Sequence, residues 1–421
     1  MDHLLAANLT RVLHDARSLL NGSFNAGGSY ADVWIRDLAT FAEVALEVNP
    51  PKKCKDILLG FFVRQHADGE CPGGYLWGSP LPDPALKFPT CLGGTATCKN
   101  NVETDQEASL VLATDAYVRV TGDVAFLSQS VHGVSVIRRC EDALDWLVGS
   151  RWHNATGLLY GGTTMDWGDM QVEPDVRDPR ELDEHSHLTI DTYDNAMFLL
   201  AIRAFMRLQK LVVSTSGETN TSGASGARDW PRMLTSVTAA VRTHLWNTTR
   251  ASFVPHLYAS SRGSPFPPSF AEWSIRCHGS LAVAAQAGIL TTDEMRRAHR
   301  AMSDDVTAVA AAGGRMTVGL TLYPPYPKAT LPNLSIMAPF TYQNGGDWTW
   351  FGGRWVSALV AHNLLHEAAD AVAPMAARVL GHGGHFYEWY DFHGQPQGSG
   401  KFHGSAGVLG KAIKDLQEAH R

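Results

Sequence analysis

The segment Tyr342-Gln343-Asn344-Gly345-Gly346-Asp347-Trp348-Thr349-Trp350 brings carboxylate, amide and indole groups together beside two glycines, just before a helical pattern. Such a mixture suits a sugar, because aromatic rings stack on the C–H faces of a pyranose while acids and amides bind its hydroxyls. The glycine pair permits close approach of the backbone. Asn344, Asp347 and Trp348 are therefore candidate substrate-binding residues.

Helical periodicity surrounds this segment, and apolar residues recur at i, i+3 and i+4 spacing along most of the chain. Thr291-Thr292-Asp293-Glu294 has the hydroxyl and acids of a helix start. The expected helices span residues 3–20, 38–48, 53–65, 105–121, 134–149, 189–211, 229–246, 270–288, 292–312, 349–370, 372–380 and 403–419. Short β-prone pieces lie at 157–161 and 252–258. This number and spacing predict an all-α fold, an (α/α)6 toroid of six helical hairpins.

The chain reads as one large domain. Its 421 residues are 44% apolar, which is enough for a large core. This length often means two domains, but no linker divides the chain, so a single catalytic domain over residues 1–421 is expected. Residues 212–228 are polar and of low complexity, and we predict a mobile surface loop there.

Charge and hydropathy exclude two classes of partner. The net charge is −7 and the basic residues are dispersed, so no nucleic-acid or anionic-membrane footprint is present. No apolar run approaches the roughly 20 residues of a membrane span.

Sequons and cysteines indicate the secretory pathway. Asn-x-Ser/Thr triplets, which could carry N-linked glycans, begin at Asn8, Asn21, Asn154, Asn220, Asn247 and Asn333. The six cysteines fit an oxidising compartment, with a small loop closed by Cys91 and Cys98 and buried thiols as the alternative. We expect a secreted or lumenal protein. Met1 opens directly into a helix without a signal peptide, so use of the sequons would require a leader or anchor that is absent from this sequence.

Further clusters combine acids with aromatic residues. In Tyr30-Ala31-Asp32-Val33-Trp34-Ile35-Arg36-Asp37 an indole could form a wall, while Arg36 and Asp37 could chelate adjacent hydroxyls. Glu103–Glu107 and Asp191–Asn195 open helices, so capping is the alternative explanation there. The candidate substrate-binding residues from all these clusters are Tyr30, Trp34, Arg36, Asp37, Asp105, Gln106, Trp167, Asp169, Tyr193, Tyr387 and Trp389.

Two carboxylates stand out as candidate catalytic groups, because glycoside hydrolysis needs a pair flanking the scissile bond. Asp166 lies in a loop beside Trp167, and an acid against an indole has the raised pKa of a general acid. Glu388 lies between Tyr387 and Trp389 in an irregular segment. A toroid would bring these distant loops to one central cavity.

In order and spacing, Trp34–Asp37, Met165–Asp169, Tyr342–Trp348 and Phe386–Asp391 resemble the motifs of six-hairpin (α/α)6 glycosidases, over about residues 25–415. The likeness is greatest to inverting enzymes of glycoside hydrolase family 63, with echoes of glucoamylases and amylo-α-1,6-glucosidases. The resemblance implies that Asp166 is the general acid and Glu388 the base, and that Arg36 and Asp37 hold sugar hydroxyls. Asp-Trp-Gly-Asp departs from the family's usual Asp-Asn pattern, which leaves Asp169 as a rival acid.

The expected function is inverting hydrolysis of an α-linked glucoside or mannoside without cofactor or metal. Trp34, Trp167, Trp348 and Trp389 are expected to form the walls of the pocket. No nucleophile elbow, Walker loop or zinc-protease motif is present. Two alternatives stay open: a phosphorylase, epimerase or lyase on the same fold, or a glycan-binding protein without catalysis.

Overall fold

The computed structural model describes residues 3–28, 30–91, 95–172, 175–216, 228–328 and 337–421, and in that part of the chain twelve α-helices alternate between an inner ring and an outer layer. Six inner helices contact one another in sequence, and the last contacts the first. They are α2 (Ile35–Ala45), α4 (Gln106–Thr121), α6 (Thr192–Ser216), α8 (His278–Gln286), α10 (Thr349–Ala361) and α12 (His403–Ala419). The outer helices are α1 (His3–Leu20), α3 (Pro51–Phe62), α5 (Val136–Ser150), α7 (Trp230–His244), α9 (Thr292–Ala311) and α11 (Leu365–Gly381). The predicted (α/α)6 toroid is confirmed.

Burial patterns explain which helices lie inside. In α10 every residue from Thr349 to Leu359 is buried, and α4 and α8 are buried almost all round. The outer α9 instead buries one stripe, which includes Met295, Ala298, Met302 and Val309. A helix that is covered on all sides belongs in the core, whereas a single apolar stripe suits a helix with one face in water.

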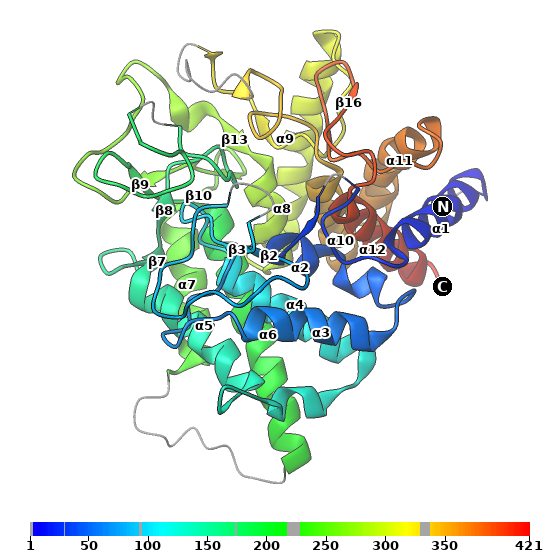
Figure 1. Cartoon of the computed structure of the whole chain (residues 1–421). Helices are drawn as coiled ribbons and strands as arrows, with labels where there is room; N and C mark the ends of the chain where they lie inside the picture. Colours follow the sequence, from blue (N-terminus) through cyan, green and yellow to red (C-terminus); the bar gives the residue numbers. More distant parts are fainter. Residues whose placement is uncertain (1–2, 29, 92–94, 173–174, 217–227, 329–336) are drawn as a thin grey trace.

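Short antiparallel strands and long loops gather on one side of the helices (Figure 1). One three-stranded sheet has β1 (Asp32–Trp34), β2 (Gly74–Leu76) and β3 (Thr97–Cys98), and another has β8 (Gly161–Gly162), β9 (Leu188–Ile190) and β12 (Leu257–Tyr258). Two-residue ribbons pair β4 (Ser130–Val131) with β5 (Val134–Ser135), β6 (Trp152–His153) with β7 (Leu158–Leu159), β10 (Trp246–Asn247) with β11 (Ser252–Phe253), β13 (Arg276–Cys277) with β14 (Leu322–Tyr323), and β15 (Trp389–Tyr390) with β16 (Pro396–Gln397). Because β1, β9 and β13 lead directly into inner helices, these strands mark the N-terminal end of the inner ring.

Several predicted helix boundaries are confirmed and others are wrong. Helices α1 and α12 have the predicted bounds, and Thr291 caps α9 in a capping box with Glu294. The single helix expected over 349–370 is two helices, because Asn363 turns the chain in the left-handed region with φ 57°. Residue 371, which the prediction placed between two helices, lies inside α11. The helix expected over 270–288 begins only at His278.

The predicted polar loop 212–228 begins later than expected. Residues 212–216 complete α6, and 217–227 lie outside the described residues. Cys91 and Cys98 form the predicted disulfide, while Cys54, Cys71, Cys140 and Cys277 are buried thiols. Among the sequons, Asn21 and Asn154 are exposed, Asn8 and Asn247 are half-buried, and Asn220 and Asn333 lie outside the described residues. Within the described helices, none is long and apolar enough to cross a bilayer.

The close contact between α2 and α12 gives a test of the ring. A Cβ atom on Gly407 would lie 2.3 Å from Cβ and 2.4 Å from Cα of Phe41, so Gly407→Ala forces the two inner helices apart. We expect a loss of about 1–3 kcal/mol in the free energy of unfolding, measured by urea denaturation.

Gly149→Ala in α5 is the matched control, because a Cβ there meets nothing within 4 Å. It should leave stability unchanged or raise it by up to about 1 kcal/mol. Equal effects of the two substitutions would contradict the close packing of α2 on α12.

Candidate active site

A cavity of about 670 Å³ opens at the N-terminal end of the inner ring. Its walls come from the starts of α2 and α10, the approach to α4, and the loops around residues 167–170 and 388. The lining residues are Ala26, Tyr30, Ala31, Asp32, Trp34, Arg36, Asp37, Gly73, Cys91, Asn100, Glu103, Trp167, Asp169, Met170, Arg180, Tyr342, Trp348, Trp350, Glu388 and Phe402. The toroid therefore joins chemistry-bearing loops that are remote in sequence.

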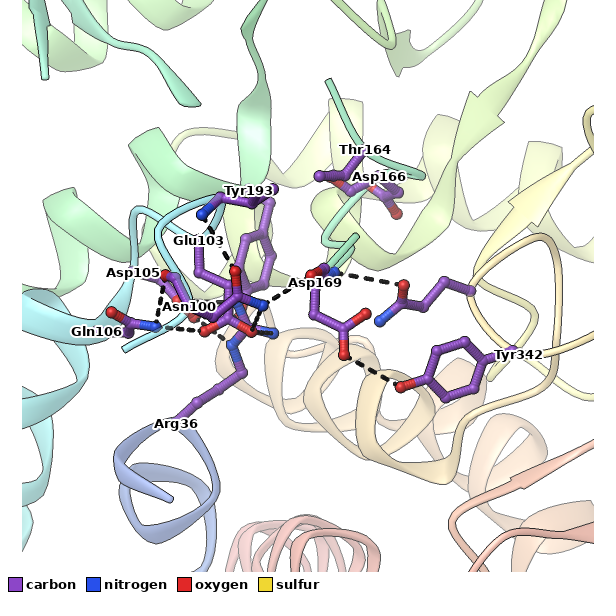
Figure 2. A network of polar contacts seen from close by, with 12 residues as sticks. Arg36, Asn100, Glu103, Asp105, Gln106, Thr164, Asp166, Asp169, Tyr193 and Tyr342 are labelled. Carbon is purple, nitrogen blue, oxygen red and sulfur yellow. Dashed lines mark hydrogen bonds and ion pairs between the residues drawn. The ribbon is translucent and has the colours of Figure 1, made fainter. Parts of the chain in front are cut away.

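A buried ion-pair network holds Arg36 in this cavity (Figure 2). Its Nε and Nη2 atoms donate to the two carboxylate oxygens of Asp105 at 2.7 and 2.9 Å, and Nη1 lies 3.2 Å from Glu103. The Tyr193 hydroxyl donates to the same Asp105 at 2.8 Å, and Gln106 donates to Glu103 at 2.7 Å. Asp105, Gln106 and Tyr193 are thus behind the cavity wall, where they orient Arg36 and Glu103.

Glu388 is one of two carboxylates that a tyrosine positions in the cavity. The hydroxyl of Tyr30 donates to Glu388 Oε2 at 3.0 Å, and the backbone N–H of Ser399 donates to it at 3.3 Å. Gly398 has a φ of 67°, and a Cβ atom on it would lie 2.4 Å from Glu388 Oε2. Both the conformation and the close approach therefore require glycine at this position. Burial raises the pKa of Glu388, which makes it a stronger base.

Asp169 is the second carboxylate, and Figure 2 shows it directed towards Tyr342. The Tyr342 hydroxyl donates to Asp169 Oδ2 at 3.2 Å, while Oδ1 has no hydrogen-bond partner among the described residues. Two amides fix the backbone: Asn100 donates to the Asp169 carbonyl at 2.7 Å, and Asp169 N–H donates to Gln343 at 3.4 Å. These contacts fix the Asp169 side chain at the cavity wall, with Oδ1 itself buried.

The structure does not bring Asp166 to the cavity, contrary to the sequence-based expectation. Asp166 adopts a left-handed conformation with φ 56° and is 2% exposed. Its carboxylate accepts hydrogen bonds from the Ser280 hydroxyl and from the Ser280 N–H at 3.0 Å, at the start of α8. Burial raises the pKa of Asp166 to about 7. The turn directs Asp166 into the protein and Trp167 and Asp169 into the cavity, so Asp169 rather than Asp166 shares the cavity with Glu388.

Aromatic rings supply a rigid wall. Trp167 packs edge-on against Trp348 and Trp350, with ring centroids 4.8 and 5.4 Å apart. The buried indole N–H groups of Trp34, Trp167 and Trp350 have no acceptor among the described residues. This wall therefore offers apolar ring surface to a ligand, while these N–H groups are buried behind it.

The remaining candidates divide into two groups. Of the predicted binding residues, the cavity is lined by Tyr30, Trp34, Arg36, Asp37, Trp167, Asp169 and Trp348. The other group, Asn344, Asp347, Tyr387 and Trp389, is not part of the lining.

The second group has structural roles instead. Asn344 donates to the carbonyls of Tyr326 and Met337, and Asp347 accepts from Arg378 at 2.8 Å. The ring of Trp389 packs against Tyr342, with centroids 6.2 Å apart. These side chains shape the loops that carry Tyr342 and Glu388 rather than the cavity surface.

Sequence reasoning missed part of the lining. Glu103, Tyr342 and Trp350 lie inside clusters that the sequence did single out, but they were not chosen as site residues. Asn100 and Arg180 come from irregular segments without any distinguishing pattern. Only the folded loops show that these side chains reach the cavity.

Comparison with known proteins places this geometry in a structural context. No family model and no curated protein sequence matches the chain. A GH63 mannosylglycerate hydrolase from Thermus thermophilus, solved with glucose, is similar over 98% of this chain and 100% of its own, with a TM-score of 0.60 and 15% identity. A rhamnosidase from Klebsiella oxytoca with rhamnose bound is similar over 97% of this chain and 64% of its own, with a TM-score of 0.59 and 12% identity.

A third solved structure, a glycosidase variant in complex with glucose, is similar over 99% of both chains, with a TM-score of 0.56 and 14% identity. At these identities the likeness establishes a shared fold. The resemblance to six-hairpin glycosidases is thereby confirmed for the architecture, and the chemistry has to be argued from this chain's own site.

The burial of Asp166 predicts a specific pH dependence of stability. Its pKa rises from 3.8 to about 7 on folding, so between these values the folded protein binds more protons than the unfolded chain. The contribution of Asp166 to the free energy of unfolding therefore falls as pH rises from about 4 to 7. Asp166→Asn removes this titration, so the wild type should lose roughly 2–4 kcal/mol relative to the variant between pH 4 and pH 8. Urea denaturation at both pH values measures this change, and a constant difference would contradict the burial of an acidic Asp166.

Proposed function

We propose that this chain is an inverting glycoside hydrolase in which Asp169 is the general acid and Glu388 the general base. The observation that carries the proposal is one cavity with two carboxylates from remote loops, each held by a tyrosine hydroxyl beside a wall of indoles. Hydrolysis of a glycosidic bond needs this arrangement, because one group protonates the leaving oxygen while the other acts on the opposite face of the sugar.

The roles follow from the surroundings of each side chain. Glu388, whose pKa burial raises, is a base strong enough to deprotonate a water near neutral pH. Asp169 lines the same cavity and is oriented by the Tyr342 hydroxyl, so its carboxyl group is the one we assign to protonation of the leaving oxygen. Asp37 and the indoles would bind the sugar's hydroxyls and ring faces, and Arg36 would help to position Asp37's end of α2.

The substrate class we propose is an α-linked glucoside or mannoside. Support comes from the order of the motifs and from the fold shared with the mannosylglycerate hydrolase and with the glycosidase that was solved with glucose. The sequons and the disulfide support a secretory location for the same activity.

Replacement of the two carboxylates tests the assignment. Asp169→Asn and Glu388→Gln should each lower kcat by about 10²–10⁴-fold on aryl α-glucosides or α-mannosides, while sugar binding measured by calorimetry persists. Asp166→Asn is the matched control and should stay within about tenfold of the wild type, because Asp166 does not line the cavity. Full turnover by Glu388→Gln, or equal loss in folded Asp166→Asn and Asp169→Asn, would refute the pair. Binding without turnover in the wild type would favour a glycan-binding protein.

The stereochemical outcome is a separate prediction. An inverting enzyme needs room for a water, with the carboxyl groups about 6.5–9.5 Å apart, whereas retention needs about 5–5.5 Å. Proton NMR of an α-glycoside digest should therefore show the β-anomer first, before mutarotation. The α-anomer as the first product would require a covalent intermediate on Glu388.

A further inference from the structure

The charged groups that line the cavity indicate which leaving groups it accepts. This inference rests on the proposed hydrolysis. The acidic and basic side chains that line it are five carboxylic acids and two guanidinium groups, and no lysine or histidine joins them among the described residues. The carboxylates are Asp32, Asp37, Glu103, Asp169 and Glu388, and the cations are Arg36 and Arg180.

Both arginines are already held by protein carboxylates. Arg36 makes its bidentate pair with the buried Asp105 and lies 3.2 Å from Glu103, so two acids surround one cation. Arg180 donates through Nε and Nη2 to Asp178, each at 2.9 Å, and through Nη1 to the Cys91 carbonyl at 2.8 Å. Bidentate recognition of an external oxyanion would require one of these forks to break its existing pair.

Two lining carboxylates, Asp37 and Glu388, have no such compensation and form no ion pair within the described part of the chain, although Arg36 acts on Asp37 at longer range. Asp169 would be protonated as the proposed general acid, and Arg180 is the cation that acts on it at longer range. Burial is the largest cause of the raised pKa of Asp37, and the charge of Glu388 raises it further. Burial and the charges of Glu388 and Asp37 also raise the pKa of the Tyr30 hydroxyl. The acids therefore already act on one another across the cavity.

We propose that this cavity accepts glycosides whose leaving group is neutral or cationic and rejects those whose leaving group carries a carboxylate or phosphate. An anionic leaving group would enter a partly desolvated site with excess negative charge and no available cation. Like charges repel one another more strongly in a medium less polar than water. This repulsion should reduce productive binding by about an order of magnitude. The same absence disfavours inorganic phosphate as the attacking group, and so a phosphorylase.

A matched pair of substrates tests this specificity. Glucosylglycerol and glucosylglycerate share the sugar and the glycosidic bond, and differ by a hydroxymethyl group in place of a carboxylate. At low ionic strength and pH 7.5, we expect kcat/KM for the neutral compound to exceed that for the acid by at least about tenfold. The ratio should shrink at about 0.5 M salt, because added ions screen the repulsion. Equal or faster turnover of the acid overturns the proposal.

Two variants separate electrostatics from shape. Asp32→Asn removes one lining acid that the proposed reaction does not use, so the preference for the neutral compound should fall at least about threefold. Asp370→Asn on the exposed surface of α11 also removes one negative charge, but it should leave the ratio unchanged. An unchanged ratio in Asp32→Asn, or an equal change in both variants, overturns the electrostatic account.

Calorimetry with thio-linked analogues of both compounds, which resist hydrolysis, separates this inference from the proposed reaction. Tighter binding of the neutral analogue supports the specificity even if neither natural glycoside is turned over, in which case the hydrolase proposal alone fails. Equal or tighter binding of the acidic analogue overturns the specificity whatever the activity.

Discussion

The contact between Arg36 and Asp105 is the constraint on which the site depends. It joins the start of α2 to the start of α4, and the Tyr193 hydroxyl brings the start of α6 to the same carboxylate. A buried pair of this kind is costly to desolvate and strongly destabilising when one partner is lost, so its geometry is fixed once the ring has closed. Three of the six inner helices thus meet at one point below the cavity.

That fixed point determines the character of the cavity above it. The guanidinium of Arg36 is occupied by acids, which leaves the adjacent Asp37 and the opposite Glu388 without a neutralising partner. Burial then raises the pKa of Glu388, and hydrogen bonds from Tyr30 and Tyr342 orient the two carboxylates proposed to act on the sugar. The proposed acid–base chemistry and the proposed preference for neutral or cationic leaving groups have one origin, namely negative charge in a partly desolvated cavity.

Much of the architecture could be predicted because it depends on local patterns. The 3.6-residue periodicity defined α1 and α12 to the residue, and the Thr291–Glu294 signature identified a real capping box. The short spacing of Cys91 and Cys98 gave the disulfide. Breaks inside apolar stretches were harder to predict, since the turn between α10 and α11 depends on a single left-handed Asn363.

The direction of side chains in the loops could not be predicted. Asp166 and Asp169 are three residues apart in one motif, and the sequence favoured the former because an indole follows it. The left-handed backbone at Asp166 reverses this choice by directing its carboxylate to Ser280. Arg180 was equally hidden, because it reaches the cavity from an irregular segment through contacts with Asp178 and the Cys91 carbonyl. Such orientations depend on tertiary contacts that no periodicity encodes.

A crystal structure of the Glu388→Gln protein with a thio-linked α-glycoside tests the central claim most directly. The account predicts the sugar ring against Trp167 and Trp350, with its anomeric carbon between residues 169 and 388 and the two carboxyl positions about 6.5–9.5 Å apart. A sugar bound outside this cavity, or one whose glycosidic oxygen contacts Asp166 instead of Asp169, would contradict it.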